Sequence, residues 1–135
     1  MADLFAAGPD NLPYSGTYIV SGDYKSTDPT AVSVGVQGAS HATIVIVTTA
    51  LSGAGCTVTP TVQGYDPASN SWYTLLAITG ITSATTTIAR IGPNVTASAG
   101  VAAQIGLPRT IRVSCVGSGT RTTLTYSVGL HLHAD

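Results

Sequence analysis

Hydrophobic and polar residues alternate most clearly near the end of the chain, over residues 122–133. The apolar side chains occupy every second position there: Leu124, Tyr126, Val128, Leu130 and Leu132. The positions between them hold Thr, Ser, Gly and His. Because successive side chains of a strand point to opposite faces, this period of two predicts an antiparallel strand with one face in a core.

Further segments carry strand patterns, and each is short and bounded by turn residues. They are residues 17–20, 31–36, 42–49, 56–65, 72–78, 85–91 and 110–116. Segment 42–49 (ATIVIVTT) is an uninterrupted β-branched run, which predicts a strand buried on both faces. Pro60 has no N–H to donate, so it predicts an edge position or a bulge within its strand.

Two stretches interrupt the strand pattern. Residues 1–30 hold Pro and Gly at short intervals, and we interpret them as an extended N-terminal arm and lead-in. Residues 92–108 form a long connection, in which we expect a short helical turn over 95–105. Eight or nine short strands predict an all-β fold, a single antiparallel β-sandwich or jelly-roll-like domain over residues 31–135.

The stretch VQGYDPASNSWYTLL, residues 62–76, joins two strand segments through a turn. Asp66 and Pro67 favour the start of a turn, and Ser and Asn residues favour its close. The single tryptophan, Trp72, follows directly, and aromatic residues in strands are usually packing residues. We predict that these side chains are buried: Ile44, Ile46, Trp72, Val113, Tyr126, Val128 and Leu130.

Charged residues make up 8% of the chain, against about 25% in ordinary proteins, and the net charge is −1. This balance predicts no attraction to nucleic acid or to an anionic membrane. So few charges have two explanations: a surface coated with Thr and Ser, or a surface partly covered by a partner, which we favour. The N-terminus has no basic region and no long apolar run, so we expect no signal peptide and no membrane span.

The titratable residues do not form a catalytic pattern. The chain has six Asp, in arm, turn or terminal positions, and no Glu, so we expect no enzyme. His131 and His133 share a strand face, but a metal site would need a third ligand, and we expect neither metal nor cofactor. Cys56 and Cys115 lie in apolar strand patterns and are predicted to be buried free thiols, although a bridge between adjacent strands stays open.

Three segments together resemble a known family. They are TVQGYDPASNSWYTLL (61–76), ARIGPNVTASAGVAAQIGLPRTIRVSCV (89–116) and LTYSVGLHL (124–132). In this order they are similar to head decoration (cement) proteins of tailed bacteriophages, especially those of actinobacterial hosts. The resemblance implies a structural β-sandwich that binds the outside of an icosahedral capsid and reinforces contacts between major capsid subunits. It carries no catalytic site.

The same resemblance implies partners and a location. The partner is the major capsid protein, with a homotrimer of the chain as an option, and neither nucleic acid nor membrane is involved. The protein would be made and assembled in the host cytoplasm and end on the outer capsid surface of the virion. The contact candidates are Leu4, Phe5, Leu12, Tyr14, Arg109, Arg112 and Arg121. The strand arginines among them either contact carboxylates of a neighbouring subunit or are solvated positions that discourage edge pairing.

Two alternatives stay beside this expectation. The stretch VQGYDPASNSW also resembles the strand-turn-strand of galactose-binding-like carbohydrate modules, which are β-sandwiches too. That resemblance implies glycan contacts at Tyr65, Trp72 and Arg109. The second alternative is another structural protein of the phage virion or tail, since such proteins share the β-sandwich pattern.

Overall fold

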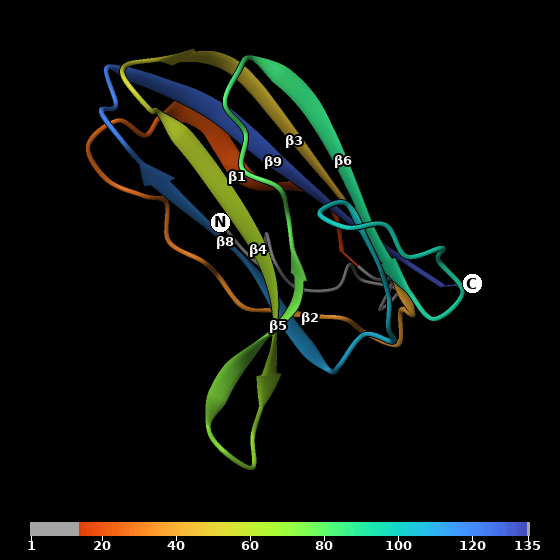
Figure 1. The fold of residues 1–135 in the computed structure, drawn as a ribbon. Coiled ribbons are helices and arrows are strands. Elements are labelled where there is room, and N and C mark those ends of the chain that lie inside the picture. Colours follow the sequence, from red (N-terminus) through yellow and green to blue (C-terminus); the bar gives the residue numbers. More distant parts are fainter. Residues whose placement is uncertain (1–13, 135) are drawn as a thin grey trace.

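Nine strands build two sheets that pack face to face in the part of the chain that the computed structural model describes, residues 14–134 (Figure 1). They are β1 (Ser15–Asp23), β2 (Val34–Gly35), β3 (His41–Ser52), β4 (Thr57–Asp66), β5 (Ser71–Ala77), β6 (Thr85–Gly92), β7 (Ala102–Gln104), β8 (Thr110–Ser118) and β9 (Thr123–His133). One sheet has the order β1-β9-β3-β6-β7 and the other β2-β8-β4-β5. The predicted all-β sandwich is confirmed.

The strand order is that of a jelly roll. β1 pairs with β9, β2 with β8, β3 with β6 and β4 with β5, all antiparallel, as in one long hairpin wrapped into two sheets. The pairs β3–β9 and β4–β8 close the wrap, and the short β7 is added parallel to β6. The connections β2–β3, β4–β5 and β6–β8 therefore lie at one end of the sandwich, together with the start of β1 and the end of β9.

β1 is a full member of the sandwich. It pairs with β9 along its length, and its Tyr18 and Ile19 are buried in the core. The expected boundary at residue 30 is therefore wrong for the part of the arm that the structure describes. Two irregularities in the β1–β9 register break the alternation that would reveal a regular strand. Residues 1–13, the rest of the predicted arm, lie outside the described residues.

Two local predictions were also wrong. Residues 95–105 contain turns and β7 instead of a helical turn. Pro60 lies in an interior strand, because β4 has neighbours on both sides. Its carbonyl accepts a hydrogen bond from the Ile78 N–H at 3.0 Å, just past the end of β5. Pro60 thus lies beyond the last residue pair of β4 and β5, where no strand partner requires an N–H from it. The bulge lies instead in β5, at Leu75.

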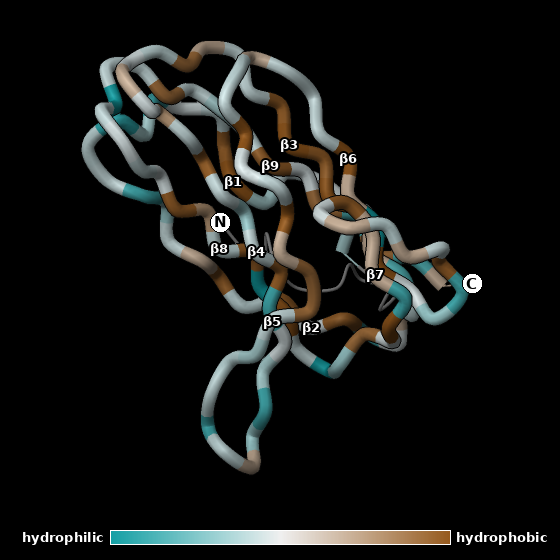
Figure 2. Tube along the Cα trace, in the orientation of Figure 1, coloured by the Kyte–Doolittle hydropathy of each residue, from teal (hydrophilic) through white to brown (hydrophobic). Residues whose placement is uncertain are grey.

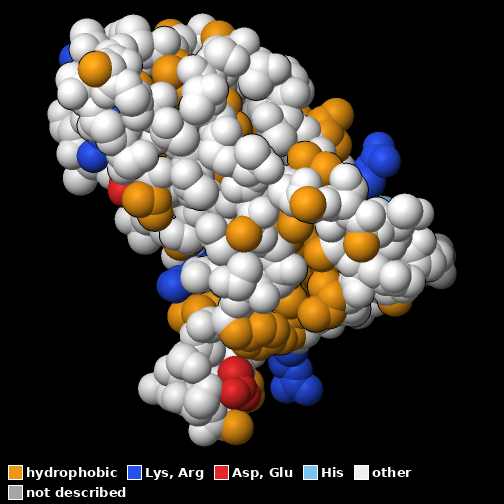
Figure 3. All heavy atoms as spheres, viewed as in Figure 1, with side chains coloured by type: hydrophobic (Ala, Val, Ile, Leu, Met, Phe, Trp, Pro, Cys, Tyr) orange, Lys and Arg blue, Asp and Glu red, His pale blue; other side chains and the backbone are white. Residues whose placement is uncertain are grey.

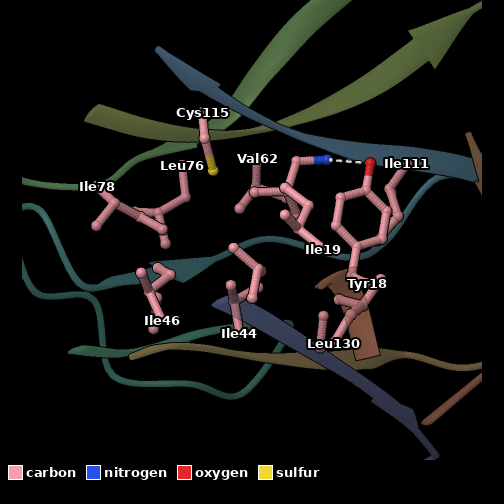
Figure 4. Close-up of a cluster of buried hydrophobic side chains, with 14 of the residues drawn as sticks. Tyr18, Ile19, Ile44, Ile46, Val62, Leu76, Ile78, Ile111, Cys115 and Leu130 are labelled. Carbon is pink, nitrogen blue, oxygen red and sulfur yellow. Dashed lines mark hydrogen bonds between the residues drawn. The ribbon is translucent and has the colours of Figure 1, made fainter. Parts of the chain in front are cut away.

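The core fills the space between the sheets, and Figure 4 shows buried apolar side chains pointing into it from both sheets. Figure 2 shows hydrophobic stretches in brown along strands of both sheets. Six of the seven predicted core side chains are buried: Ile44, Ile46, Val113, Tyr126, Val128 and Leu130. Trp72 is the wrong one, because it is only partly buried. β3 is not buried on both faces either, since its Val45 and Val47 are partly exposed. Cys56 and Cys115 are buried free thiols, as predicted.

Tyr18 joins the two sheets through the core, where its ring reaches from β1 to β8 (Figure 4). Its hydroxyl accepts a hydrogen bond from the Val113 N–H at 3.1 Å and donates to the Val32 carbonyl at 2.5 Å. β2 pairs with only two residues of β8, so within residues 14–134 most of that edge of β8 has no partner strand. Tyr18 and the Asp28 carboxylate, which accepts from the Gly117 N–H at 2.9 Å, bind this edge instead.

Candidate binding surface at the hairpin end

The β4–β5 hairpin extends beyond the body of the sandwich (Figure 1). β8 pairs with β4 only as far as Gly64, so Tyr65 and Asp66 have β5 as their only neighbouring strand. The hydroxyl of Tyr65 donates a hydrogen bond to the side-chain oxygen of Asn70, and Asn70 itself has a φ of 55°. A two-stranded ribbon needs such contacts to hold one shape in water.

Polar groups of the DPASNS turn bind one another at the tip. The Asp66 carboxylate accepts hydrogen bonds from the Ser69 hydroxyl at 2.7 Å and from the Ala68 N–H at 3.1 Å. These bonds, the Ser69 bond first, hold the pKa of Asp66 below its ordinary value. The hydroxyls of Ser69 and Ser71 are also hydrogen-bonded, at 2.6 Å. The tip is therefore a preformed polar turn.

Trp72 lies on the outer face of the hairpin instead of in the core. It is opposite Tyr65, with 5.2 Å between the ring centroids. The Arg112 guanidinium lies 4.2 Å from the centroid of the Trp72 ring, and its Nε donates to the Gln63 side chain at 2.7 Å. A cation over an aromatic face is attracted to it, so Trp72 and Arg112 hold each other in place.

The other face of the hairpin base contacts the segment before β8. A Cβ on Gly64 would lie 2.7 Å from Cγ of Pro108 and 2.9 Å from Cζ of Tyr73. The Tyr73 ring and Pro108 thus close over a position that only glycine can occupy without a shift of its neighbours. Tyr73 nevertheless remains 42% exposed. It therefore presents an exposed aromatic ring at the base of the hairpin.

Two hollows adjoin Arg109, on either side of the chain. One, of about 600 Å³, lies between Arg109 and the hairpin, where Tyr65, Asp66 and Tyr73 line it. The other, also about 600 Å³, lies between Arg109 and residues 35–39 of the β2–β3 connection. Figure 3 shows hydrophobic side chains gathered where the hairpin leaves the sandwich, with an acidic and a basic side chain beside them. Tyr73, Pro108, Arg109 and both hollows are called the hairpin-base surface below.

The three arginines predicted as capsid or subunit contacts differ in what their side chains already bind. Arg112 is held against Trp72, and Arg121 forms an ion pair of 2.8 Å with Asp28 at the opposite end of the sandwich. The side chain of Arg109 is exposed, and its guanidinium has no hydrogen bond or ion pair within residues 14–134. Arg109 is therefore the one of the three that can take a new partner without breaking an existing contact.

The other predicted contacts separate as well. The Tyr14 side chain is buried in the chain's own sandwich, at 7% exposure. Leu4, Phe5 and Leu12 lie outside the described residues.

The predicted glycan contacts do not all meet. Tyr65 and Arg109 line the same hollow, but Trp72 does not. Tyr73 does line it, and the sequence pattern did not indicate that residue. Its place opposite Gly64 depends on the register that the hairpin turn sets between β4 and β5, and the alternation of residues within one strand does not reveal that register.

His131 and His133 contact side chains of the strands next to β9. Nδ1 of His131 is hydrogen-bonded to the Ser15 hydroxyl at 2.7 Å, and the His133 ring stacks on His41 with centroids 5.4 Å apart. Within residues 14–134, no three His, Cys, Asp or Glu side chains are close enough to hold a metal ion. The same part of the chain contains no helix that is long and apolar enough to cross a membrane.

No protein-family model matches the chain, and a search of curated proteins found no significant match.

Proposed function

We propose that this chain is a structural virion protein of a tailed bacteriophage, which binds the outer surface of the icosahedral capsid and reinforces contacts between major capsid subunits. One observation carries the proposal. The hairpin 62–76 and the segment 107–109 are two separate parts of the resemblance to decoration proteins, and they meet over Gly64 in one exposed surface. Tyr and Arg are enriched at protein interfaces, and a fixed surface loses little entropy when it binds.

The first described residue, Tyr14, lies at the same end of the sandwich as the hairpin. The Tyr14 carbonyl accepts a hydrogen bond from the Leu132 N–H at 2.9 Å, near the end of β9. The β2–β3 connection links this region to the hairpin-base surface, since the Val36 N–H donates to the Arg109 carbonyl at 2.9 Å. The predicted contacts Leu4, Phe5 and Leu12 precede Tyr14 in the chain. We therefore propose that the hairpin end faces the capsid and that the end with Arg121 faces outward.

A carbohydrate-binding module is the second candidate. Jelly rolls occur in viral capsid proteins and in lectins, so the fold does not decide between the two functions. The hollow lined by Tyr65, Tyr73 and Arg109 favours this candidate, because sugars bind to aromatic faces flanked by polar groups. Against it, Asp66 and Ser69 on the same wall already bind each other and leave few free groups for sugar hydroxyls. A third candidate, another structural protein of a phage virion or tail, would bind its partner through the same kind of exposed surface.

Co-sedimentation with capsids that lack the protein tests the proposal. We expect binding that saturates at a fixed ratio of protein to capsid subunit. The decorated capsid should also resist heating better, because a ligand that binds only the intact state stabilises it. No co-sedimentation at any ratio would refute the proposal. Glycan-array binding that disappears on Tyr73→Ala would favour the carbohydrate module instead.

A further inference from the structure

We infer that the hairpin-base surface binds an extended polypeptide segment of the capsid subunit, and that this segment presents an Asp or Glu carboxylate to Arg109. The inference rests on the proposed function, since it names the surface and the partner chemistry of the same attachment. Three features lead to it: the hydrogen-bonding groups that remain free, the shape of the surface, and the exposed Tyr73 ring.

The first feature is the balance of donors and acceptors in the hollow beside the hairpin. Both oxygens of Asp66 accept hydrogen bonds from the turn, and the hydroxyls of Ser69 and Ser71 are bonded to each other. The Tyr65 hydroxyl donates to Asn70. Two groups remain free in this lining: the Tyr73 hydroxyl, and the guanidinium of Arg109, which offers five N–H donors, no acceptor and the only uncompensated charge of the hollow within residues 14–134. A carboxylate matches that fork with two parallel charge-assisted bonds, so the ligand should bring an acid.

The second feature is shape. The two hollows share Pro108 and Arg109 in their linings, so they adjoin each other at these two residues. A ligand that fills both would have to pass over Arg109. Small-molecule sites usually enclose most of their ligand. Both hollows are instead broadly open to solvent, and the same two residues, Pro108 and Arg109, line both of them. This geometry suits an extended segment that lies across both hollows, with its acid over Arg109.

The third feature is the Tyr73 ring beside Arg109. The ring packs against Pro108 over Gly64, and yet 42% of the residue is exposed. A rigid aromatic side chain next to an arginine is typical of the few residues that carry most of the binding energy of an interface. An apolar side chain of the partner segment would cover the ring and exclude water from the Arg109–carboxylate pair.

The test uses the capsid co-sedimentation assay with the full-length protein and four variants. Arg109→Glu reverses the charge, and we expect at least about tenfold weaker binding, since like charges across an interface repel. Arg109→Lys keeps the charge but loses the two-pronged geometry, and a loss of about threefold or more is expected. Tyr73→Ala should weaken binding about tenfold or more. Arg90→Glu is the matched control, because Arg90 is exposed on β6 and does not line either hollow.

The outcomes separate the inference from the proposed function. Failure of the wild-type protein to sediment with capsids overturns both. If the wild type binds and Arg109→Glu binds within about twofold of it, the capsid function stands and the carboxylate partner is rejected. Equal losses for Arg109→Glu and Arg90→Glu would reject it too, because the effect would then be one of net charge. Release of the wild type by free galactose would assign the hollow to carbohydrate and overturn the inference.

A salt titration of the wild type gives an independent readout that needs no variant. Affinity should fall as salt rises, because salt screens the attraction between the Arg109 guanidinium and the carboxylate while the partners approach each other. A binding constant that does not change with salt would contradict the inference. Circular dichroism of each variant, compared with the wild type, ensures that weaker binding does not arise from a loss of fold.

Discussion

Removing one oxygen atom from the core, by Tyr18→Phe, should weaken the fold far more than its size suggests. Tyr18 is only 4% exposed, and its hydroxyl serves two backbone groups, the Val113 N–H and the Val32 carbonyl. These groups lie beyond the two residues of β2, where the β2-side edge of β8 has no partner strand within residues 14–134. The phenylalanine ring would fill the same space but leave both groups without this partner.

The size of the effect follows from the two groups. A buried backbone group that loses its hydrogen bond costs about 1–3 kcal/mol, so the pair should cost about 2–4 kcal/mol. For a domain of this size, that loss corresponds to a fall in melting temperature of about 10 °C. Tyr24→Phe is the matched control. The Tyr24 hydroxyl donates to the Val20 carbonyl at 2.6 Å in an exposed bond, and its loss should cost less than about 1 kcal/mol.

Urea unfolding of the wild type and both variants measures these free energies, and amide hydrogen exchange locates the effect. In Tyr18→Phe the Val113 amide should exchange faster than its neighbours in β8, because its acceptor is gone. The reasoning is refuted if Tyr18→Phe is as stable as Tyr24→Phe, or if the exchange of Val113 does not change. In that case another group, or water, satisfies the edge of β8.

Two further predictions concern the core. Val128→Ala removes two methyl groups at a position that is 1% exposed, so unfolding free energy should fall by about 1–3 kcal/mol, and an unchanged melting temperature would reject the orientation of β9. Burial raises the pKa of the Cys115 thiol from 9.0 to about 12, which favours the protonated form in the folded state. Its contribution to stability is therefore complete below pH 9.0 and is lost as the pH rises towards about 12. Cys115→Val should make the alkaline loss of stability shallower by about 1.4 kcal/mol per pH unit in that range, and identical slopes for the two proteins would contradict this.

The fold could be predicted from local patterns because most of its strands have one regular buried face. β9 alternates without a break, and its inward side chains are buried as expected. β1 was harder to recognise, because its register with β9 shifts twice and its buried residues, Tyr18 and Ile19, are adjacent instead of alternating. The sheet order and the jelly-roll wrap depend on pairings between distant segments, which a local period does not contain.

The candidate site was only partly predictable for a related reason. The hairpin and its turn are local features, and their sequence indicated them. Trp72 was expected in the core because aromatic residues in strands usually pack there, but this hairpin extends past the end of β8. The contact of Tyr73 with Pro108 over Gly64 joins segments far apart in the chain. It depends on the pairing of Gly64 with Tyr73 and on where the segment before β8 crosses the hairpin, and the second of these is visible only in the folded chain.

The most direct test of the central claim is a cryo-electron microscopy reconstruction of capsids saturated with this protein. The proposal predicts ordered jelly rolls on the outer surface, bridging neighbouring capsid subunits. The β4–β5 hairpin and Arg109 should face the capsid, with an acidic side chain of a capsid subunit within hydrogen-bonding distance of the Arg109 guanidinium. The connection between β8 and β9 should point away from the particle. Bare capsids, or jelly rolls attached through the β8–β9 end with the hairpin free in solvent, would contradict the account.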